Sequence, residues 1–263
     1  MRKCSPEVVN VALGKRLRTC RSISCIGVLP NFEDYDFESR LLIEKAGKVY
    51  YPSAIYEPLF DSLGKATFPK NYYTFVGNKI KQTLLFEWCG VNHPKTRIVY
   101  GRRKEEKILK EFEYPFIAKN PVGSSQGKGV FLIRHEGELR RYLEKHDPAY
   151  VQEYLPTDRD LRVVIFAGRV INAYWRIGKP GEFRHNVSQG ATISFDNIPE
   201  DAIDFALDVV RRCGFGEVGL DVLPYNREYY VIEANMVYGM EGFRCRGLDV
   251  YVMFKRAERE GWL

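Results

Sequence analysis

The chain has 263 residues, of which 45% are hydrophobic and 28% charged, with a mean hydropathy of −0.33. These values are typical of a globular protein with a substantial buried core. No run approaches the ~20 apolar residues that cross a bilayer, and the N-terminus lacks a signal peptide's apolar region, so we expect a cytoplasmic protein without a membrane partner. The six cysteines and four histidines show neither zinc-site spacing nor the pattern of a catalytic triad.

The net charge of +6 is concentrated at the N-terminus, where residues 1–30 carry six Lys or Arg against the single acid Glu7. Such a segment can contact nucleic acid or an acidic partner. The segment is also typical of a solubilising helix that starts at Ser5 and Pro6 and has one apolar side. No basic stripe rich in aromatic residues accompanies it, so a nucleic-acid partner is not expected. The apolar side would consist of Val8, Val9, Ala12, Leu13 and Leu17.

The first 76 residues are expected to form this basic helix and a small α/β lobe. Apolar runs and helical periodicity alternate along it, which favours strands that alternate with helices. The predicted elements are strand Cys25–Leu29, helix Phe37–Ala46, strand Lys48–Tyr51 and helix Ile55–Leu63. The segment FPKNYYTF then indicates a linker.

The remaining residues, 77–263, are expected to form one domain with two subdomains, 77–150 and 151–263. In the first, Asn78 is placed to cap a helix that Gly90 ends. The predicted elements of the first subdomain are helix Lys79–Cys89, strand Thr96–Tyr100, helix Lys104–Glu111, strands Phe116–Lys119 and Gly129–Arg134, and helix Gly137–Lys145. The second is predicted to contain Tyr150–Leu155, a hairpin that turns at Gly168, helix Glu200–Cys213 and a hairpin that turns at Asn226.

A glycine-rich loop, GSSQGKG, joins two of these strands directly after Lys119. Glycines let backbone N–H groups approach an anion, and lysines add positive charge, so the loop suits phosphate. It departs from the P-loop pattern at Val122 and Gly129, and a merely flexible loop would have a similar composition.

Two polar segments follow in the second subdomain. In VQEYLPTDRDLR, Glu153 and Asp160 can accept hydrogen bonds from an adenine amine and a ribose hydroxyl, although a solvated loop explains them as well. In GEFRHN, Arg184 can neutralise a phosphate or carboxylate beside Asn186, and a surface loop is the alternative.

The hairpin GLDVLPYNREYYVIEAN places carboxylates on neighbouring strands. A turn at 226–228 would pair Tyr225 with Tyr229 and therefore Asp221 with Glu233, with Cβ atoms roughly 5 Å apart. Like charges at that distance repel, which predicts that Asp221→Asn relieves repulsion and that a hard cation with oxygen ligands binds there. Two carboxylates on a wet sheet face are the alternative.

In their order along the chain, these segments resemble the ATP-grasp superfamily, and particularly the ligases that add glutamate to ribosomal protein S6. The resemblance covers about Phe75–Leu263. It includes NKIKQTLLFEWCGVNHPKT, PFIAKN, the glycine loop, VQEYL, the hairpin DLRVVIFAGRVINAYWR, GEFRHN, GLDVL and VIEAN with GMEG. It implies an α+β ATP-grasp fold, two subdomains that clasp ATP, behind a reduced N-terminal α/β lobe.

The resemblance also implies roles for individual residues. Lys79 and Lys119 would contact the nucleotide phosphates, and Glu153 and Tyr154 the adenine edge. Asp160 would contact the ribose. Arg184 and Asn186 would reach the transferring phosphate. The lid would be the loop with Gly123, Ser124, Ser125, Gly127, Lys128 and Gly129, and the ligands of Mg (with Mn as an alternative) would be Asp221, Glu233 and Asn235.

The activity that the resemblance implies is ATP-dependent joining of a carboxylate to an amine, through an acyl phosphate, with release of ADP and phosphate. The resemblance does not decide whether the substrates are small molecules or peptide termini. A homo-oligomer is possible as well. Departures from the family pattern are a glycine loop one residue longer, Arg159 before Asp160, and one glycine in VSQGATIS where relatives have two. An ATP-binding module without ligase activity is therefore an alternative. Arg246, after GMEG, is a candidate for an acceptor carboxylate or an ordinary surface residue.

Overall fold

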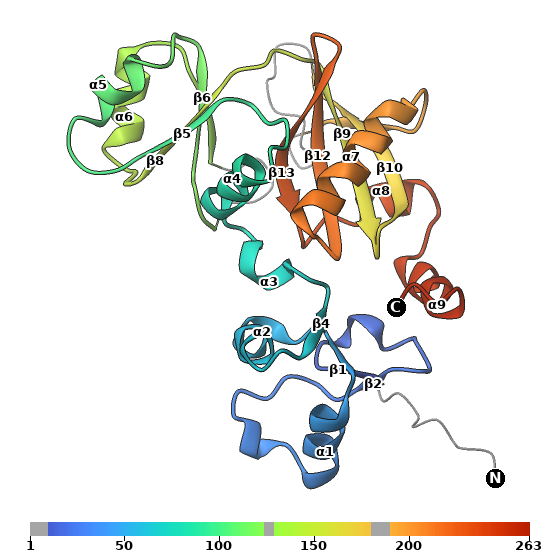
Figure 1. Cartoon of the computed structure of the whole chain (residues 1–263). Helices are drawn as coiled ribbons and strands as arrows, with labels where there is room; N and C mark the ends of the chain where they lie inside the picture. The colour runs from blue at the N-terminus through green and yellow to red at the C-terminus, as the bar shows by residue number, and fades with distance from the viewer. Residues whose placement is uncertain (1–9, 124–128, 180–189) are drawn as a thin grey trace, which may run out of the picture.

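A computed structural model describes residues 10–123, 129–179 and 190–263. Its strands form three sheets: a small parallel sheet near the N-terminus and two antiparallel sheets in the rest of the chain (Figure 1). The mixture of helices with mainly antiparallel sheets confirms the expected α+β class. Within these described ranges, no helix is long and apolar enough to cross a bilayer.

The N-terminal lobe is built on a parallel sheet with the order β2-β1-β3-β4. Its elements are β1 Asn10–Ala12, a 3₁₀ turn Lys15–Leu17, β2 Ser24–Cys25, a 3₁₀ turn Phe32–Asp34, α1 Phe37–Lys45, β3 Lys48–Tyr50, α2 Ser53–Ser62, β4 Ala66–Phe68 and α3 Tyr72–Phe75. The segment FPKNYYTF thus contributes the end of a strand and a short helix, and the prediction of a plain linker was wrong.

The predicted N-terminal helix was also wrong over the part that is described. Val11 and Ala12 lie in the inner strand β1, with no exposed surface, and the residues that follow form only a 3₁₀ turn. A short apolar run fits a buried strand as well as a helix face, and burial on both faces of a parallel sheet favours the strand here. Residues 1–9 lie outside the described part.

The first subdomain has an antiparallel sheet with the order β5-β8-β6-β7. Asn78 caps its first helix as predicted, because its side chain accepts a 3.0 Å hydrogen bond from the Lys81 amide. The elements are α4 Lys79–Trp88, β5 Thr96–Val99, α5 Lys104–Leu109, β6 Phe116–Lys119, β7 Val130–Ile133, α6 Glu136–Leu143 and β8 Ala149–Glu153. The sheet packs on α5 and α6 around its own small core.

The second subdomain has a five-stranded antiparallel sheet with the order β11-β10-β9-β12-β13. Helix α7 lies across one face (Figure 1) and ends at Gly214, whose φ of +67° is the left-handed conformation of a helix end. The elements are β9 Arg159–Phe166, β10 Arg169–Ile177, β11 Thr192–Ser194, α7 Glu200–Cys213, β12 Glu217–Tyr225, β13 Glu228–Asn235, α8 Glu241–Cys245 and α9 Val250–Arg259.

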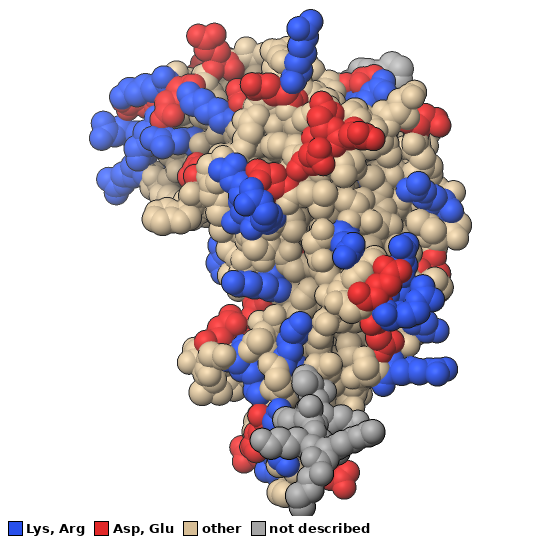
Figure 2. Space-filling view, turned by 45° about the vertical axis from the view of Figure 1, so that its right-hand side comes forward, with Lys and Arg blue, Asp and Glu red and all other residues tan. Residues whose placement is uncertain are grey.

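The largest core joins this sheet to the N-terminal lobe, since Leu17 and Tyr51 are buried in the same cluster as Val164 and Phe254. Lys, Arg, Asp and Glu side chains are interspersed over the face that Figure 2 shows, so this face has no extended surface of one sign. The domain limits 1–76 and 77–263 stay predictions.

Candidate functional site

The hairpin of β12 and β13 brings Asp221 opposite Glu233, as predicted, but by a different route. The turn has two residues, Asn226 and Arg227, both with positive φ (50° and 65°), so Tyr225 pairs with Glu228 and the predicted three-residue turn was wrong. A bulge at Ile232 then shifts the register by one residue and restores the Asp221–Glu233 pair.

Asp221 is paired with two arginines, one on the adjacent strand β9 and one on β10 beyond it. Its carboxylate is 2% exposed and accepts from Arg162 Nε of β9, from Arg176 Nη2 of β10 at 2.9 Å and from Asn235 Nδ2 at 3.2 Å. Burial by itself would raise the pKa of Asp221, but the guanidinium groups of Arg162 and Arg176 hold it below its usual value. The expected repulsion between Asp221 and Glu233 is therefore offset inside the protein, and the prediction that Asp221→Asn relieves it loses its basis.

Glu233 forms a separate ion pair, with Lys79. Lys79 Nζ, at the start of α4, lies 2.8 Å from Glu233 Oε1, and Lys79 is only 4% exposed. Gln82, one turn further along α4, holds this geometry, because its side chain donates to the Ala234 carbonyl (2.8 Å) and accepts from the Ala234 amide (3.0 Å). Gln82 thus holds α4 against β13, next to the predicted metal ligands Glu233 and Asn235.

Lys119 at the end of β6 faces the same group of charges. It is 7% exposed, and its burial lowers its pKa to about 8, with Lys79 acting in the same direction and Glu233 and Asp221 opposing. The chain around it is tied to α4: the Lys79 amide donates to the Pro121 carbonyl (2.9 Å) and the Gly123 amide to the Gly77 carbonyl (3.1 Å). Two lysines and two carboxylates that are distant in sequence thus meet between the two antiparallel sheets.

Only the ends of the glycine loop are described. The Asn120 amide donates to the Gly129 carbonyl at 2.7 Å, which closes the base of the loop. Gly129 has a φ of +84°, and a Cβ there would lie 2.6 Å from the Asn120 side chain, so both conformation and space require glycine. Ser124, Ser125, Gly127 and Lys128 lie outside the described residues, as do Arg184 and Asn186.

The residues predicted for adenine and ribose lie at the junction of β8 and β9. The Glu153 side chain accepts from the Lys95 amide at 2.6 Å, and Tyr154 follows it, half-buried. Asp160 is 3% exposed, and both its oxygens accept from Arg176, at 2.6 and 2.8 Å. A ribose hydroxyl would therefore share an acceptor that Arg176 already uses.

Sequence reasoning missed Arg176 and assigned no role to Arg162, although a signal existed. In DLRVVIFAGRVINAYWR, polar residues recur at alternate positions near the open ends of both strands, which places Asp160, Arg162 and Arg176 on one face. Together with Asp221 they form a compact buried network of two cations and two anions.

The donor set at the hairpin suits a hard divalent cation, since Asp221, Glu233 and Asn235 all offer oxygen ligands. They occupy paired positions of β12 and β13, with Gly219 opposite Asn235. Among the residues that the structure describes, no three His, Cys, Asp or Glu gather into a further metal-type cluster. The chemistry of these three side chains thus fits magnesium, with Lys79 beside them.

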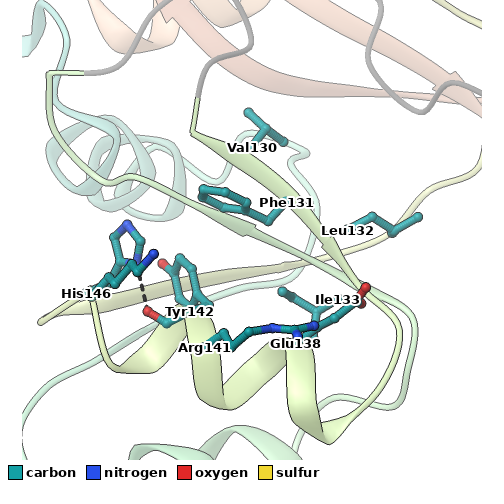
Figure 3. Close-up of a pocket in the computed structure, with 9 residues that line it drawn as sticks. Val130, Phe131, Leu132, Ile133, Glu138, Arg141, Tyr142 and His146 are labelled. Atoms are coloured by element: carbon teal, nitrogen blue, oxygen red, sulfur yellow. Dashed lines mark hydrogen bonds between the residues drawn. The ribbon is translucent and has the colours of Figure 1, made fainter.

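A separate pocket of about 410 Å³ opens between β7 and α6 (Figure 3). Figure 3 shows the rings of Phe131 and Tyr142 beside His146, with Arg141 and Glu138 nearer the start of α6. His146 Nδ1 lies 2.7 Å from the Tyr142 carbonyl oxygen, at hydrogen-bond distance. Its lining includes none of the residues predicted for nucleotide or metal, so the pocket is distinct from the site between the sheets.

Residues 76–255 match the model of the RimK-like ATP-grasp domain, which is well over half of the chain. This chain belongs to the RimK-like ATP-grasp family. The resemblance inferred from the sequence motifs is thereby confirmed.

Curated relatives of this RimK-like chain include coenzyme gamma-F420-2:alpha-L-glutamate ligase of Methanococcus maripaludis, 30% identical over 182 residues (66% of this chain and 63% of that protein). Beta-citrylglutamate synthase B of Danio rerio is 33% identical over 171 residues, which are 61% of this chain and 42% of the relative. The matched part of the chain spans less than two thirds of these relatives' length.

Among solved structures, the ATP-grasp ligase PsnB, complexed with a phosphomimetic variant of its minimal precursor, Mg and ADP, has a TM-score of 0.66. The two chains are 15% identical, and the match covers 98% of this chain and 99% of PsnB. The RimK domain protein of Sphaerobacter thermophilus has a TM-score of 0.65 at 17% identity, over 94% of this chain and 98% of that one. At these identities the likeness shows the fold alone, and it confirms the expected ATP-grasp architecture.

Proposed function

We propose that this RimK-like chain is an ATP- and Mg-dependent ligase that joins a carboxylate to an amine through an acyl phosphate. The observation that carries the proposal is the meeting of Lys79 and Lys119 with Asp221 and Glu233 between the two antiparallel sheets. Two cations for phosphate beside oxygen ligands for magnesium are what a site for a metal–nucleotide complex requires. The names of the relatives support ligation, with glutamate as one of the partners.

The chemistry assigned to the protein is positioning and charge compensation. Lys79 and Lys119 would hold the ATP phosphates, and Asp221, Glu233 and Asn235 would hold magnesium, which offsets charge on the phosphates. The substrate carboxylate attacks the γ-phosphate and forms the acyl phosphate with release of ADP. The amine then attacks the acyl carbon and expels phosphate, which leaves the amide, so no protein nucleophile is required.

Other roles in this proposal come from the family. Arg184 and Asn186 would act on the transferring phosphate, Glu153 and Tyr154 would contact adenine, and the glycine loop would cover the phosphates. For Asp160, the paired contact with Arg176 supports a role in orienting Arg176 more than a ribose contact. A cytoplasmic location and a homo-oligomer stay predictions.

The nucleotide assignment is tested by calorimetric titration of ATP with Mg into Lys79→Ala and Lys119→Ala. Each variant loses a charged contact to phosphate and should bind ATP roughly ten- to a hundredfold more weakly. Lys81→Ala is the matched control, because Lys81 lies on the same helix but is exposed. Wild-type affinity in both active-site variants would contradict the assignment.

Ligase activity is tested by measuring ADP release over a panel of carboxylates and amines that includes L-glutamate. We expect release that requires both substrates and is lost in Asp221→Asn. If ATP binds but no pair gives ADP above background, the chain is a binding module without ligase activity.

A further inference from the structure

A second polar group lies on the same sheet face as the candidate active site. Asn172 of β10 is 1% exposed, and its Oδ1 accepts from Arg246 Nη1 at 3.3 Å. Its Nδ2 is buried and has no hydrogen-bond partner among the described residues. A buried N–H donor without a partner costs stability, so its retention calls for a ligand or a function.

Arg246 completes this group with a positive charge. It is exposed, it lies directly after α8, and its guanidinium lies 5.2 Å from the centre of the Phe195 ring. Among the described residues, the Arg246 guanidinium contacts this ring and Asn172, and neither is a carboxylate. An exposed cation next to a buried unsatisfied donor is an arrangement that suits a carboxylate.

The position of Arg246 is set by close packing of α8 on β10. A Cβ added to Gly242 of α8 would lie 2.1 Å from the Tyr174 ring, so only glycine allows this approach. Tyr174 in turn packs on Phe195, with ring centres 6.1 Å apart. The end of α8 is thereby held over Asn172.

The register relates this group to the reacting centre. Asn172 lies two residues from Tyr174, which pairs with Arg162, which pairs with Asp221, so all four occupy one face. Two strand spacings and two residues along the strand separate the Cα atoms of Asn172 and Asp221 by about 12 Å. Tyr174 and Arg162 lie between them on this face.

We propose that Arg246 and Asn172 form a subsite for the side-chain carboxylate of an acidic amino-acid substrate. Arg246 supplies the charge and Asn172 Nδ2 donates the hydrogen bond that it lacks in the described structure. The substrate's reacting group would then point along the sheet face toward Asp221. This inference rests on the proposed ligase function and selects its substrate class.

The test is calorimetric titration of L-glutamate and of L-glutamine into the full chain preloaded with ADP and Mg. The wild type should bind L-glutamate at least tenfold more tightly than L-glutamine, since only glutamate carries the side-chain carboxylate. Arg246→Ala and Asn172→Leu should each lose about tenfold in glutamate affinity and most of this preference, with ADP affinity unchanged. Arg244→Ala is the matched control, because Arg244 is exposed on α8 and pairs with Glu241.

A folding readout separates a ligand role from a structural one. Asn172→Leu removes an unpaired buried donor, so its Tm should equal or exceed that of the wild type while glutamate affinity falls. Asn172→Asp, which places a negative charge beside Arg246, serves as a second variant and should also weaken glutamate binding.

The proposal is overturned if the wild type does not bind L-glutamate, if it binds L-glutamate and L-glutamine equally, or if Arg244→Ala loses as much affinity as Arg246→Ala. Loss of ADP binding in Asn172→Leu or Arg246→Ala would likewise contradict it. Glutamate binding that depends on Asn172 without any turnover would leave the subsite standing and contradict the ligase function instead.

Discussion

Asp221 lies between Arg162 and Arg176 with 2% of its surface exposed, and Asp160 completes this buried network. Each arginine depends on the carboxylates for compensation, since an uncompensated buried charge is costly. The carboxylate that would hold magnesium is therefore also a structural counter-ion. We therefore expect its removal to affect folding as well as the proposed nucleotide turnover.

We expect Asp221→Asn to destabilise the free protein by about 3–5 kcal/mol, because it leaves two buried guanidinium groups with one carboxylate. Urea unfolding in the absence of nucleotide measures this. Asp208→Asn is a suitable control, since Asp208 pairs with Arg211 at the surface, where ion pairs contribute about 0–1 kcal/mol. Equal or greater stability of Asp221→Asn would instead support repulsion between Asp221 and Glu233.

Lys119 titrates near physiological pH, because burial lowers its pKa to about 8 in the free protein. A bound phosphate favours the charged form, so the nucleotide complex takes up a proton when Lys119 is neutral. The expected sign follows: with Lys119 as the proposed phosphate contact, ATP affinity is fully present below the free pKa of about 8 and falls as pH rises from there toward the higher pKa of the complex.

The affinity for ATP should fall about tenfold between pH 7 and pH 9 in the wild type. Lys119→Arg should show a much flatter profile, since a guanidinium stays charged throughout this range. Titrations at several pH values with Mg in excess provide the measurement. A profile in Lys119→Arg as steep as that of the wild type would assign the effect to another group.

At the scale of elements, the β12–β13 hairpin combines a strained turn with a bulge that shifts the strand register by one residue. Asn226 and Arg227 have the positive φ values that a type I′ turn requires, and Arg227 is a side chain that rarely adopts them. The bulge at Ile232 then places Glu233 opposite Asp221. The site thus depends on the bulge for its register, and the turn can be altered independently.

Arg227→Gly should stabilise the protein by about 1 kcal/mol, because glycine adopts positive φ without steric cost. Arg227→Val should destabilise it by a similar amount. ATP affinity should be unchanged in both variants, which thermal unfolding and calorimetry together would show. A change in ATP affinity would mean that the turn, and not the bulge, sets the register at Asp221.

At the scale of the whole molecule, a buried polar group joins the N-terminal lobe to the strand that carries Asp221. Glu217, at the start of β12, is 1% exposed and accepts from Arg16 Nε at 2.8 Å, Tyr238 at 2.7 Å and Tyr51. Arg16 also lies 5.3 Å from the centre of the Phe254 ring in α9. The ion pair of Arg16 and Glu217 therefore links the lobe to the central sheet, and Arg16 also contacts the C-terminal helix.

Arg16→Ala should destabilise the protein by about 3–5 kcal/mol, since it leaves Glu217 buried without its cation. Adding Glu217→Gln should recover part of this loss, and a double-mutant cycle measures the coupling. Arg18→Ala is the control: Arg18 is exposed and lies over Tyr251 at 4.9 Å, a contact worth about 0.5–1 kcal/mol. Additive effects of Arg16 and Glu217 would show that the two lobes are not coupled through this pair.

Local signals in the chain predicted most helices and strands of residues 77–235. The cap at Asn78, Gly90 after α4 and the alternation along β9 and β10 each have a local physical cause. Predictions failed where local patterns were ambiguous, as at β1, or weak, as in the short elements β4 and α3. Helices α8 and α9 were not predicted, and their packing on the rest of the fold was not evident from the chain alone.

By itself, the sequence determined the family and the order of most elements, and it predicted the oxygen and lysine side chains of the candidate site, because these are carried by motifs and local spacing. Only the tertiary structure decided which charges meet. Arg162 and Arg176 reach Asp221, Lys79 reaches Glu233, and Arg246 reaches Asn172 from strands and helices up to 154 positions apart, Lys79 to Glu233 being the longest of these separations. Burial then sets the desolvation free energy of each charged side chain. Burial is a property of the packed molecule and not of any one segment.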